Sequence, residues 1–150
     1  MNYSNPDLTQ HPPRSARVRL GGYVILPRCL DKCRAALAGK NGDYHYACPL
    51  DQRWLQFVGI EPDALQAEVK KGLSDAELLT WINVNAKHPR EDWEIAQWSA
   101  VAEQRAPSDH ETRGYFNGLV ASAKGTHRED IVGWFDLLDF DDYVSYGGKP

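Results

Sequence analysis

The sequence predicts an all-α domain: a compact bundle of six to seven short helices, with at most one small strand pair and an ordered strap at the C-terminus. Three observations predict this class. Apolar residues recur at helical spacing, capping-box patterns mark helix starts, and prolines and glycines divide the 150-residue chain into short segments. A chain of this length buries enough surface to fold without a disulfide or a metal.

The first third of the chain contains an arm and one clear helix. Residues 1–16 hold three prolines and few apolar groups, so we expect an extended N-terminal arm. Residues 17–150 then form a single helical domain, whose first helix runs from about Tyr23 to a glycine stop at Gly39. The apolar stripe of that helix consists of Leu26, Leu30, Cys33 and Leu37.

Prolines and caps delimit the middle helices. Pro49 and Pro62 each open a short helix, since proline is tolerated in the first turn. The Ser74–Glu77 capping box starts the next helix, and Pro89 interrupts its pattern. A helix from about Arg90 to Arg105 is apolar on two faces, so we expect it to lie centrally among its neighbours.

Two further capping boxes predict the last helices. Ser108–Glu111 and Thr126–Glu129 both match the pattern in which a hydroxyl and a carboxylate satisfy the free amides of a helix start. The tail DFDDYVSYGGKP, from Asp139 onward, contains apolar residues that need cover, and we expect it to form the ordered strap.

The charge distribution limits the classes of partner. The net charge of −4 argues against a nucleic-acid binder, which usually has a basic excess. Residues 1–40 carry +5 and the remainder −9. Either the basic front packs against the acidic back of one domain, or the front builds a pocket for an anion.

The sequence predicts a cytoplasmic protein with no membrane contact. Its three cysteines are odd in number and do not form a disulfide framework. The N-terminus lacks the apolar core of a signal peptide, and no apolar run approaches the ~20 residues of a membrane span.

Several blocks resemble a known family. These blocks are RVRLGGYVILPRCLDKCRAALAGKNGDYHYACPLD, WEIAQWS, QRAPSD and WFDLLDFDDYVSYGG. From about Arg14 to Gly148 the chain resembles a bacterial family of small single-domain proteins classified as a domain of unknown function. The resemblance implies a stand-alone bacterial domain and transfers no reaction.

Polar side chains of several different types lie close together in the sequence between Leu30 and Asp51, beside a glycine-bracketed turn. This clustering predicts a site for a small anionic ligand. Arginine binds carboxylates and phosphates through paired hydrogen bonds. The predicted ligand-binding residues are Arg28, Lys32, Arg34, Tyr44, Tyr46 and Trp98. If the domain is an enzyme, which the sequence leaves open, His45 is the candidate base, with Asp31 or Asp51 orienting it.

Two alternatives involve no anion pocket. The charges of the first helix would form an exposed ladder in which Asp31 pairs with Arg28 or Arg34. Separately, the domain could be a non-enzymatic interaction or structural protein, whose basic arm and acidic tail meet a partner or a second copy in a homodimer.

Metal sites are the weaker alternatives. The tetrahedral zinc set would be Cys29, Cys33, His45 and Cys48. A hard cation would use the acidic cluster Asp136, Asp139, Asp141 and Asp142. The zinc spacing is unusual and the calcium-loop pattern is absent, so we predict no metal and no cofactor.

Overall fold

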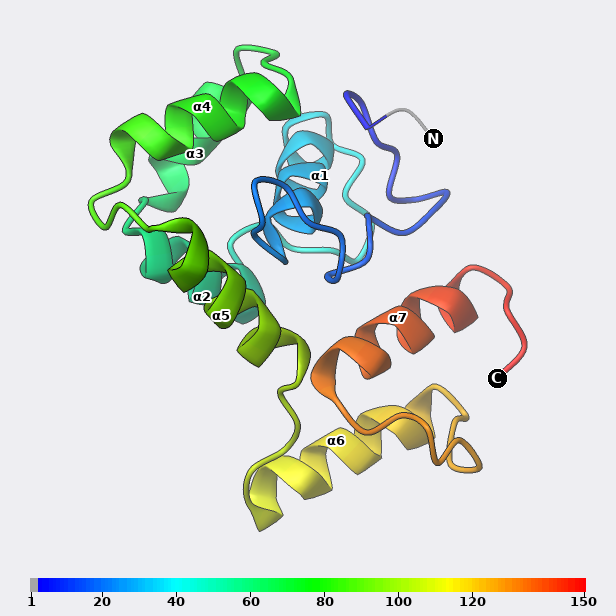
Figure 1. Ribbon diagram of the computed structural model, residues 1–150. Coiled ribbons are helices and arrows are strands. Elements are labelled where there is room, and N and C mark those ends of the chain that lie inside the picture. Colours follow the sequence, from blue (N-terminus) through cyan, green and yellow to red (C-terminus); the bar gives the residue numbers. More distant parts are fainter. Residues whose placement is uncertain (1–2) are drawn as a thin grey trace.

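The computed structural model describes residues 3–150, and within them the chain forms seven α-helices joined by short loops (Figure 1). The helices are α1 (Leu26–Leu37), α2 (Pro49–Val58), α3 (Pro62–Val69), α4 (Asp75–Asn85), α5 (Asp92–Glu103), α6 (His110–Ser122) and α7 (Trp134–Ser145). The mainly helical class is confirmed. Over the described residues, strand-like pairing is limited to one isolated bridge between Leu20 and Tyr23.

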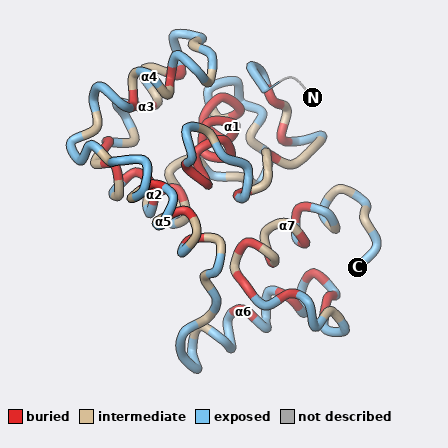
Figure 2. The backbone as a smooth tube through the Cα atoms, in the orientation of Figure 1, coloured by how far each residue is buried: buried red, intermediate tan, exposed pale blue. Residues whose placement is uncertain are grey.

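α1 is the central helix of the fold. Every residue from Leu26 to Ala35 is buried, and the tube through α1 is almost entirely in the buried colour in Figure 2. Three members of its predicted apolar stripe, Leu26, Leu30 and Cys33, pack into the main core, whereas Leu37 at the end of the helix is 40% exposed. The expectation that the Arg90–Arg105 helix would be central is wrong, because Trp93 and Val101 on α5 are 63% and 65% exposed.

The N-terminal arm, which the structure describes from residue 3 to residue 16, contains no helix and packs beside α1. Leu8 is 1% exposed, and its backbone amide donates to the carbonyl of Lys40 at 2.8 Å. The hydroxyl of Tyr146 donates to the carbonyl of Leu8 at 2.6 Å, so the C-terminal end of α7 is tied to the arm.

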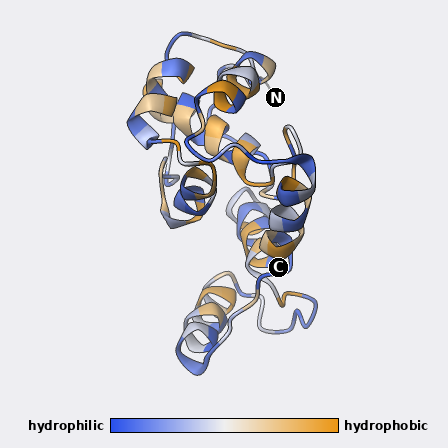
Figure 3. Cartoon of the chain, turned by 60° about the vertical axis from the view of Figure 1, so that its left-hand side comes forward, coloured by the Kyte–Doolittle hydropathy of each residue, from blue (hydrophilic) through white to orange (hydrophobic). Residues whose placement is uncertain are grey.

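α6 and α7 form a helix pair with a small core of their own. Figures 1 and 3 both place α6 at the outer edge of the molecule, with α7 between it and the remaining helices. The members of this second core are Phe116, Val120, Ala123, Ile131, Leu137 and Phe140. α7 therefore has two neighbours, α6 on one side and the α1 region on the other.

Some of the predicted helix starts are confirmed, and one is displaced along the chain. The Ser74–Glu77 capping box forms in full, and Pro49 and Pro62 each occupy the first position of a helix. The box expected at Ser108 forms one residue later, where the Asp109 carboxylate accepts from the backbone amide of Thr112 at 2.8 Å.

The third predicted box is wrong. Residues 126–130 lie outside the helices, and α7 begins only at Trp134. There the carboxylate of Asp136 accepts the amide of Gly133 at 2.7 Å and caps the helix from inside its first turn. Most of the expected C-terminal strap is consequently helical, since α7 continues to Ser145.

The first helix also begins later than expected. It starts at Leu26 rather than near Tyr23, because Ile25 adopts a positive φ of 71°, which interrupts a right-handed helix. Pro27 lies in the first turn, where its missing amide leaves no hydrogen bond unmade.

Candidate functional site

The charged face of α1 is buried as completely as its apolar face. Arg28, Asp31, Lys32 and Arg34 are at most 8% exposed. Buried charges are costly unless each is paired. Each of these four has a partner from another part of the chain, so the alternative of an exposed ion-pair ladder along α1 is wrong.

Arg28 pairs with the C-terminal helix. Its guanidinium donates to both carboxylate oxygens of Asp142 on α7, at 2.6 and 3.1 Å. The hydroxyl of Tyr44 donates to the same carboxylate at 2.7 Å. Burial and the neighbouring Asp142 raise the pKa of Tyr44, so the phenol stays a protonated donor.

Lys32 lies between a carboxylate and a thiol. Its Nζ atom is 2.8 Å from Oδ1 of Asp51 and 3.1 Å from Sγ of Cys48. Burial alone would lower the pKa of Lys32, but Asp51 and Cys48 more than offset it, and the net shift is upward. The lysine therefore remains a cation. Cys48 is the N-cap residue of α2, directly after Ala47 with its positive φ of 57°.

Asp31 and Arg34 belong to a second network on the arm side of α1. Asp31 accepts from the Arg14 side chain at 2.7 and 2.9 Å, not from Arg28 or Arg34 as the helical spacing suggested. Arg14 and Arg34 share the carboxylate of Asp75, at 2.6 and 2.7 Å. This network joins the arm, α1 and the start of α4.

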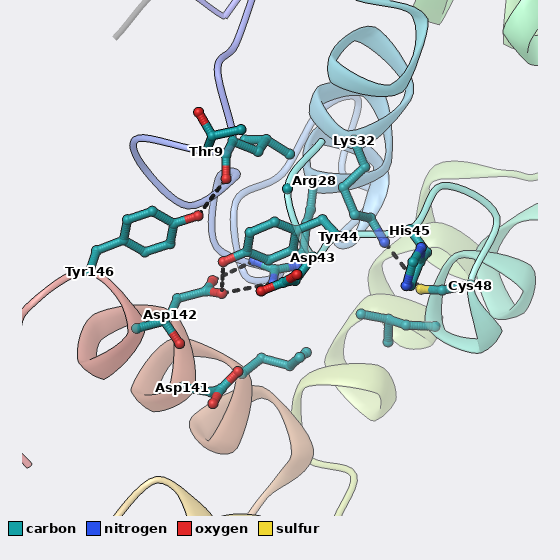
Figure 4. A pocket seen from close by; sticks show the side chains of 15 residues that line it. Thr9, Arg28, Lys32, Asp43, Tyr44, His45, Cys48, Asp141, Asp142 and Tyr146 are labelled. Atoms are coloured by element: carbon teal, nitrogen blue, oxygen red, sulfur yellow. Dashed lines mark hydrogen bonds and ion pairs between the residues drawn. The ribbon is translucent and has the colours of Figure 1, made fainter. Parts of the chain in front are cut away.

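A cavity of about 610 Å³ opens between α1, the loop before α2 and α7, with the arm at one side (Figure 4). We call it the polar pocket. Seven of its lining residues come from the stretch singled out in the sequence, between Leu30 and Asp51: Lys32, Gly42, Asp43, Tyr44, His45, Cys48 and Leu50. Arg28, also on α1, lines the pocket from just before that stretch. α7 and the following residue contribute Leu138, Asp141, Asp142, Ser145 and Tyr146, and the arm contributes Leu8 and Thr9.

The unpaired charges of the polar pocket are acidic. Its two cations, Arg28 and Lys32, are each bound to a carboxylate. Asp43 and Asp141 also line the pocket, and neither makes an ion pair with a residue of the 3–150 range. Burial and the nearby Asp142 raise the pKa of Asp141. The free carboxylates therefore give this pocket a negative excess.

The structure separates several of the predicted site residues from the pocket. Tyr46 points elsewhere and donates to the carbonyl of Pro62 at 2.8 Å. Trp98 stacks on Phe57 with 4.8 Å between ring centroids and lies outside the pocket. Arg34 and Asp31 belong to the arm network. Asp51 sits behind Lys32, fully buried, and is not itself a lining residue.

The predicted catalytic trio does not assemble. His45 is exposed at the pocket, and across residues 3–150 its ring makes no side-chain hydrogen bond with Asp31 or Asp51. In the usual nucleophile–base arrangement, a third group within hydrogen-bond reach orients the base. The carboxylates that were expected to orient His45 bind Arg14 and Lys32 instead.

Neither metal alternative gathers its ligands. In the described part of the chain, no group of three or more histidine, cysteine or acidic residues is arranged to hold a metal ion. Cys29 and Cys33 are in the core, where burial raises the pKa of both thiols, that of Cys33 to about 12. Asp136 and Asp139 on α7 bind Arg17, while Asp142 binds Arg28.

The polar pocket contains residues that the sequence argument did not assign to it. Tyr146 and Ser145 come from the tail for which the sequence predicts a strap, and the sequence assigns Asp141 and Asp142 to a metal site or to an acidic surface that meets a partner. The clustering of tyrosine and aspartate in that tail was the one available signal. It did not say which face of α1 the tail would cover.

The chain belongs to a family of unknown function. The model of the domain of unknown function DUF5069 matches residues 10–144 of the 150. No curated protein matches the chain. Between residues 3 and 150, none of the helices has both the length and the apolar character needed to cross a membrane.

Proposed function

We propose that this member of the DUF5069 family is a cytoplasmic small-molecule-binding domain and that its binding site is the polar pocket. The observation that carries the proposal is the convergence of Arg28, Lys32, Tyr44, His45 and Cys48 on one concave space of about 610 Å³. Ligand sites are typically concave and between ~300 and ~1,000 Å³, with a few well-placed polar groups. The three free cysteines support a reducing compartment.

The back wall of the pocket is built to be rigid. The Asp142 carboxylate accepts three hydrogen bonds of 2.6–3.1 Å, two from Arg28 and one from Tyr44. Lys32 contacts both Asp51 and Cys48, which fix its position. Such ordering before binding reduces the entropy that a ligand would lose on the protein side. The groups free to contact a ligand are those nearer the solvent: Asp43, His45, Asp141 and the Ser145 hydroxyl.

This set of free groups favours a neutral or cationic ligand with several hydrogen-bond donors. The earlier expectation of an anionic ligand rested on Arg28, Lys32 and Arg34. Those three cations are already neutralised by Asp142, Asp51 and Asp75. A carboxylate or phosphate entering this pocket would meet Asp43 and Asp141 without gaining an unpaired cation.

Affinity selection from a mixture of small polar metabolites tests the proposal. The purified chain is mixed with a bacterial metabolite extract, separated by rapid gel filtration, and the retained compounds are identified by mass spectrometry. We expect the wild type to retain a compound that His45→Ala and Asp141→Asn lose, because both side chains line the pocket.

Matched controls come from outside the pocket. His88 and Asp63 are exposed and line none of the polar pocket, so His88→Ala and Asp63→Asn are expected to retain the compound as the wild type does. Retention of no compound, or equal retention by the pocket variants and the wild type, would reject the proposal. A shift of the chain to a dimer or a protein complex in the same extract would instead favour the interaction-domain alternative.

A further inference from the structure

A second cavity, of about 480 Å³, lies between the start of α2 and the α6–α7 pair. We call it the apolar pocket. Its walls are formed mainly by Leu50, Leu119, Trp134 and Leu138. Two arginines, Arg53 on α2 and Arg105 just after α5, also line it. The pocket thus combines an apolar interior with a positively charged portion.

These two arginines differ from the other arginines of the chain. Of the ten, seven make an ion pair with a carboxylate, and Arg113 lies over the ring of Phe116 at 5.8 Å. Among the residues that the structure describes, Arg53 and Arg105 have neither a carboxylate within 4.0 Å nor an aromatic ring beneath the guanidinium. Both uncompensated arginines line the same cavity.

The arrangement holds two like charges near each other without a counter-ion. Burial and the neighbouring Arg53 lower the pKa of Arg105. No carboxylate acts on Arg105 strongly enough to oppose this shift, although Asp141 lines the same pocket. A bound anion would relieve the repulsion between the two guanidinium groups and satisfy donors that the protein leaves free.

We propose that the apolar pocket binds a small apolar monocarboxylate, with its carboxylate held by Arg53 and Arg105 and its apolar body packed against Leu50, Leu119 and Trp134. The volume accommodates a molecule of drug-like size rather than a lone inorganic ion. An apolar wall with a paired cationic end selects a molecule that has both parts, and guanidinium groups bind carboxylates through paired hydrogen bonds.

This site is separate from the one proposed above, although the two cavities adjoin. They share Cys48, Leu50, Leu138 and Asp141 as common wall residues. The polar pocket has no free cation, whereas the apolar pocket has two. A carboxylate is therefore directed to Arg53 and Arg105, and its binding does not depend on His45.

Calorimetric titration with naphthoate tests the proposal, with two compounds as references. Naphthalenemethanol has the same apolar body without the charge, and acetate has the charge without the apolar body. We expect naphthoate to bind the wild-type chain roughly tenfold or more tightly than either reference, since a charged hydrogen-bonded contact and the apolar body each contribute. The naphthoate affinity should also fall as salt is added.

Variants assign the binding to the two arginines. Arg53→Gln and Arg105→Gln should each weaken naphthoate roughly tenfold or more. Arg113→Gln is the matched control, because Arg113 also lacks an ion pair but lies outside the pocket, and it should bind as the wild type does. His45→Ala should also leave naphthoate binding unchanged, which separates this site from the polar pocket.

Equal affinity for naphthoate and naphthalenemethanol would overturn the proposal, because the arginines would then contribute nothing. So would wild-type affinity in both Arg53→Gln and Arg105→Gln, or no detectable naphthoate binding at millimolar concentration. Unchanged melting temperatures of the two variants would show that any loss of affinity is not a loss of folding.

Discussion

The polar face of α1 and the apolar pocket both contain arginines, but only the arginines of α1 are paired with carboxylates. On α1, Arg28 and Arg34 are at most 8% exposed, and each is bound to a carboxylate from a distant segment. In the apolar pocket, Arg53 and Arg105 have no such partner within residues 3–150. The first pair of arginines links segments of the fold together, whereas the second pair is available to a ligand.

The difference teaches that crowding of charge is not by itself evidence of a binding site. The densest polar stretch of the sequence, around α1, is where the structure cancels charge most completely. The less conspicuous arginines remain uncompensated. If the comparison is right, substitutions on α1 should act mainly on stability, and substitutions in the apolar pocket mainly on binding.

The largest effect is expected from breaking the Arg28 ion pair. Arg28→Ala leaves Asp142 buried without its cation, and removal of one partner from a buried pair destabilises by about 3–5 kcal/mol. Urea unfolding measures the loss. Arg128→Ala is the control, because its pair with Asp130 is largely exposed and should be worth less than about 1 kcal/mol. Similar losses of unfolding free energy in both variants would show that the buried ion pair on α1 contributes no more to stability than an exposed one.

The reactivity of the cysteines is expected to differ by about a hundredfold or more between core and pocket, since buried groups react only after local opening. Iodoacetamide should modify Cys48, which is partly exposed in the polar pocket, before Cys29 and Cys33, which are fully buried on α1. Mass spectrometry of peptides follows each site. In urea the three rates should become similar, and rapid native modification of Cys29 would contradict the buried position of α1. A compound retained in the polar pocket should slow the reaction of Cys48.

Asp75 gives a pH test of the arm network. Burial alone would raise the pKa of Asp75, but hydrogen bonds from Arg14 and Arg34 lower it below its usual value. The folded state therefore binds fewer protons than the unfolded state near pH 4, so this contribution is present at neutral pH and is lost on acidification.

Asp75→Asn should therefore cost about 2 kcal/mol at neutral pH, a typical value for hydrogen bonds to a charged group. The difference from the wild type should shrink as the pH falls below about 4, the pKa of an unperturbed aspartate. Urea unfolding at both pH values measures it, with Asp63→Asn, on the exposed side of α3, as the control. A loss of the same size at both pH values would mean that the charge of Asp75 does not matter.

Local signals in the sequence predict the helices well and the site only in part. Helical spacing and the Ser74–Glu77 box depend on residues within one turn of one another, so the pattern and the structure coincide there. The Thr126–Glu129 pattern shows the limit. It matches a capping box, but the chain turns at these residues and begins α7 only at Trp134. A capping pattern therefore permits a helix start without requiring one.

Local sequence patterns do not predict the partners of the charged residues on α1. Arg28 and Asp142 are 114 positions apart, and Tyr44 and Asp142 are 98 apart. Helical spacing pointed instead to pairs within α1, which would suffice only if that face were exposed. Its burial depends on how the arm and α7 fold over it, and no local pattern encodes that packing.

The smallest effect on stability is expected from Arg53→Gln. Arg53 is exposed and makes no ion pair within the described chain. Its positive charge repels that of Arg105 and lowers the pKa of Arg105. Removing it should change the free energy of unfolding by no more than about 0.5 kcal/mol, as for surface substitutions away from specific contacts, and any change should be stabilising because a repulsion is relieved. Urea unfolding beside Arg28→Ala measures both on one scale. A loss above about 1 kcal/mol in Arg53→Gln would mean that Arg53 has a structural partner after all, and the contrast between the two regions would no longer separate stability from binding.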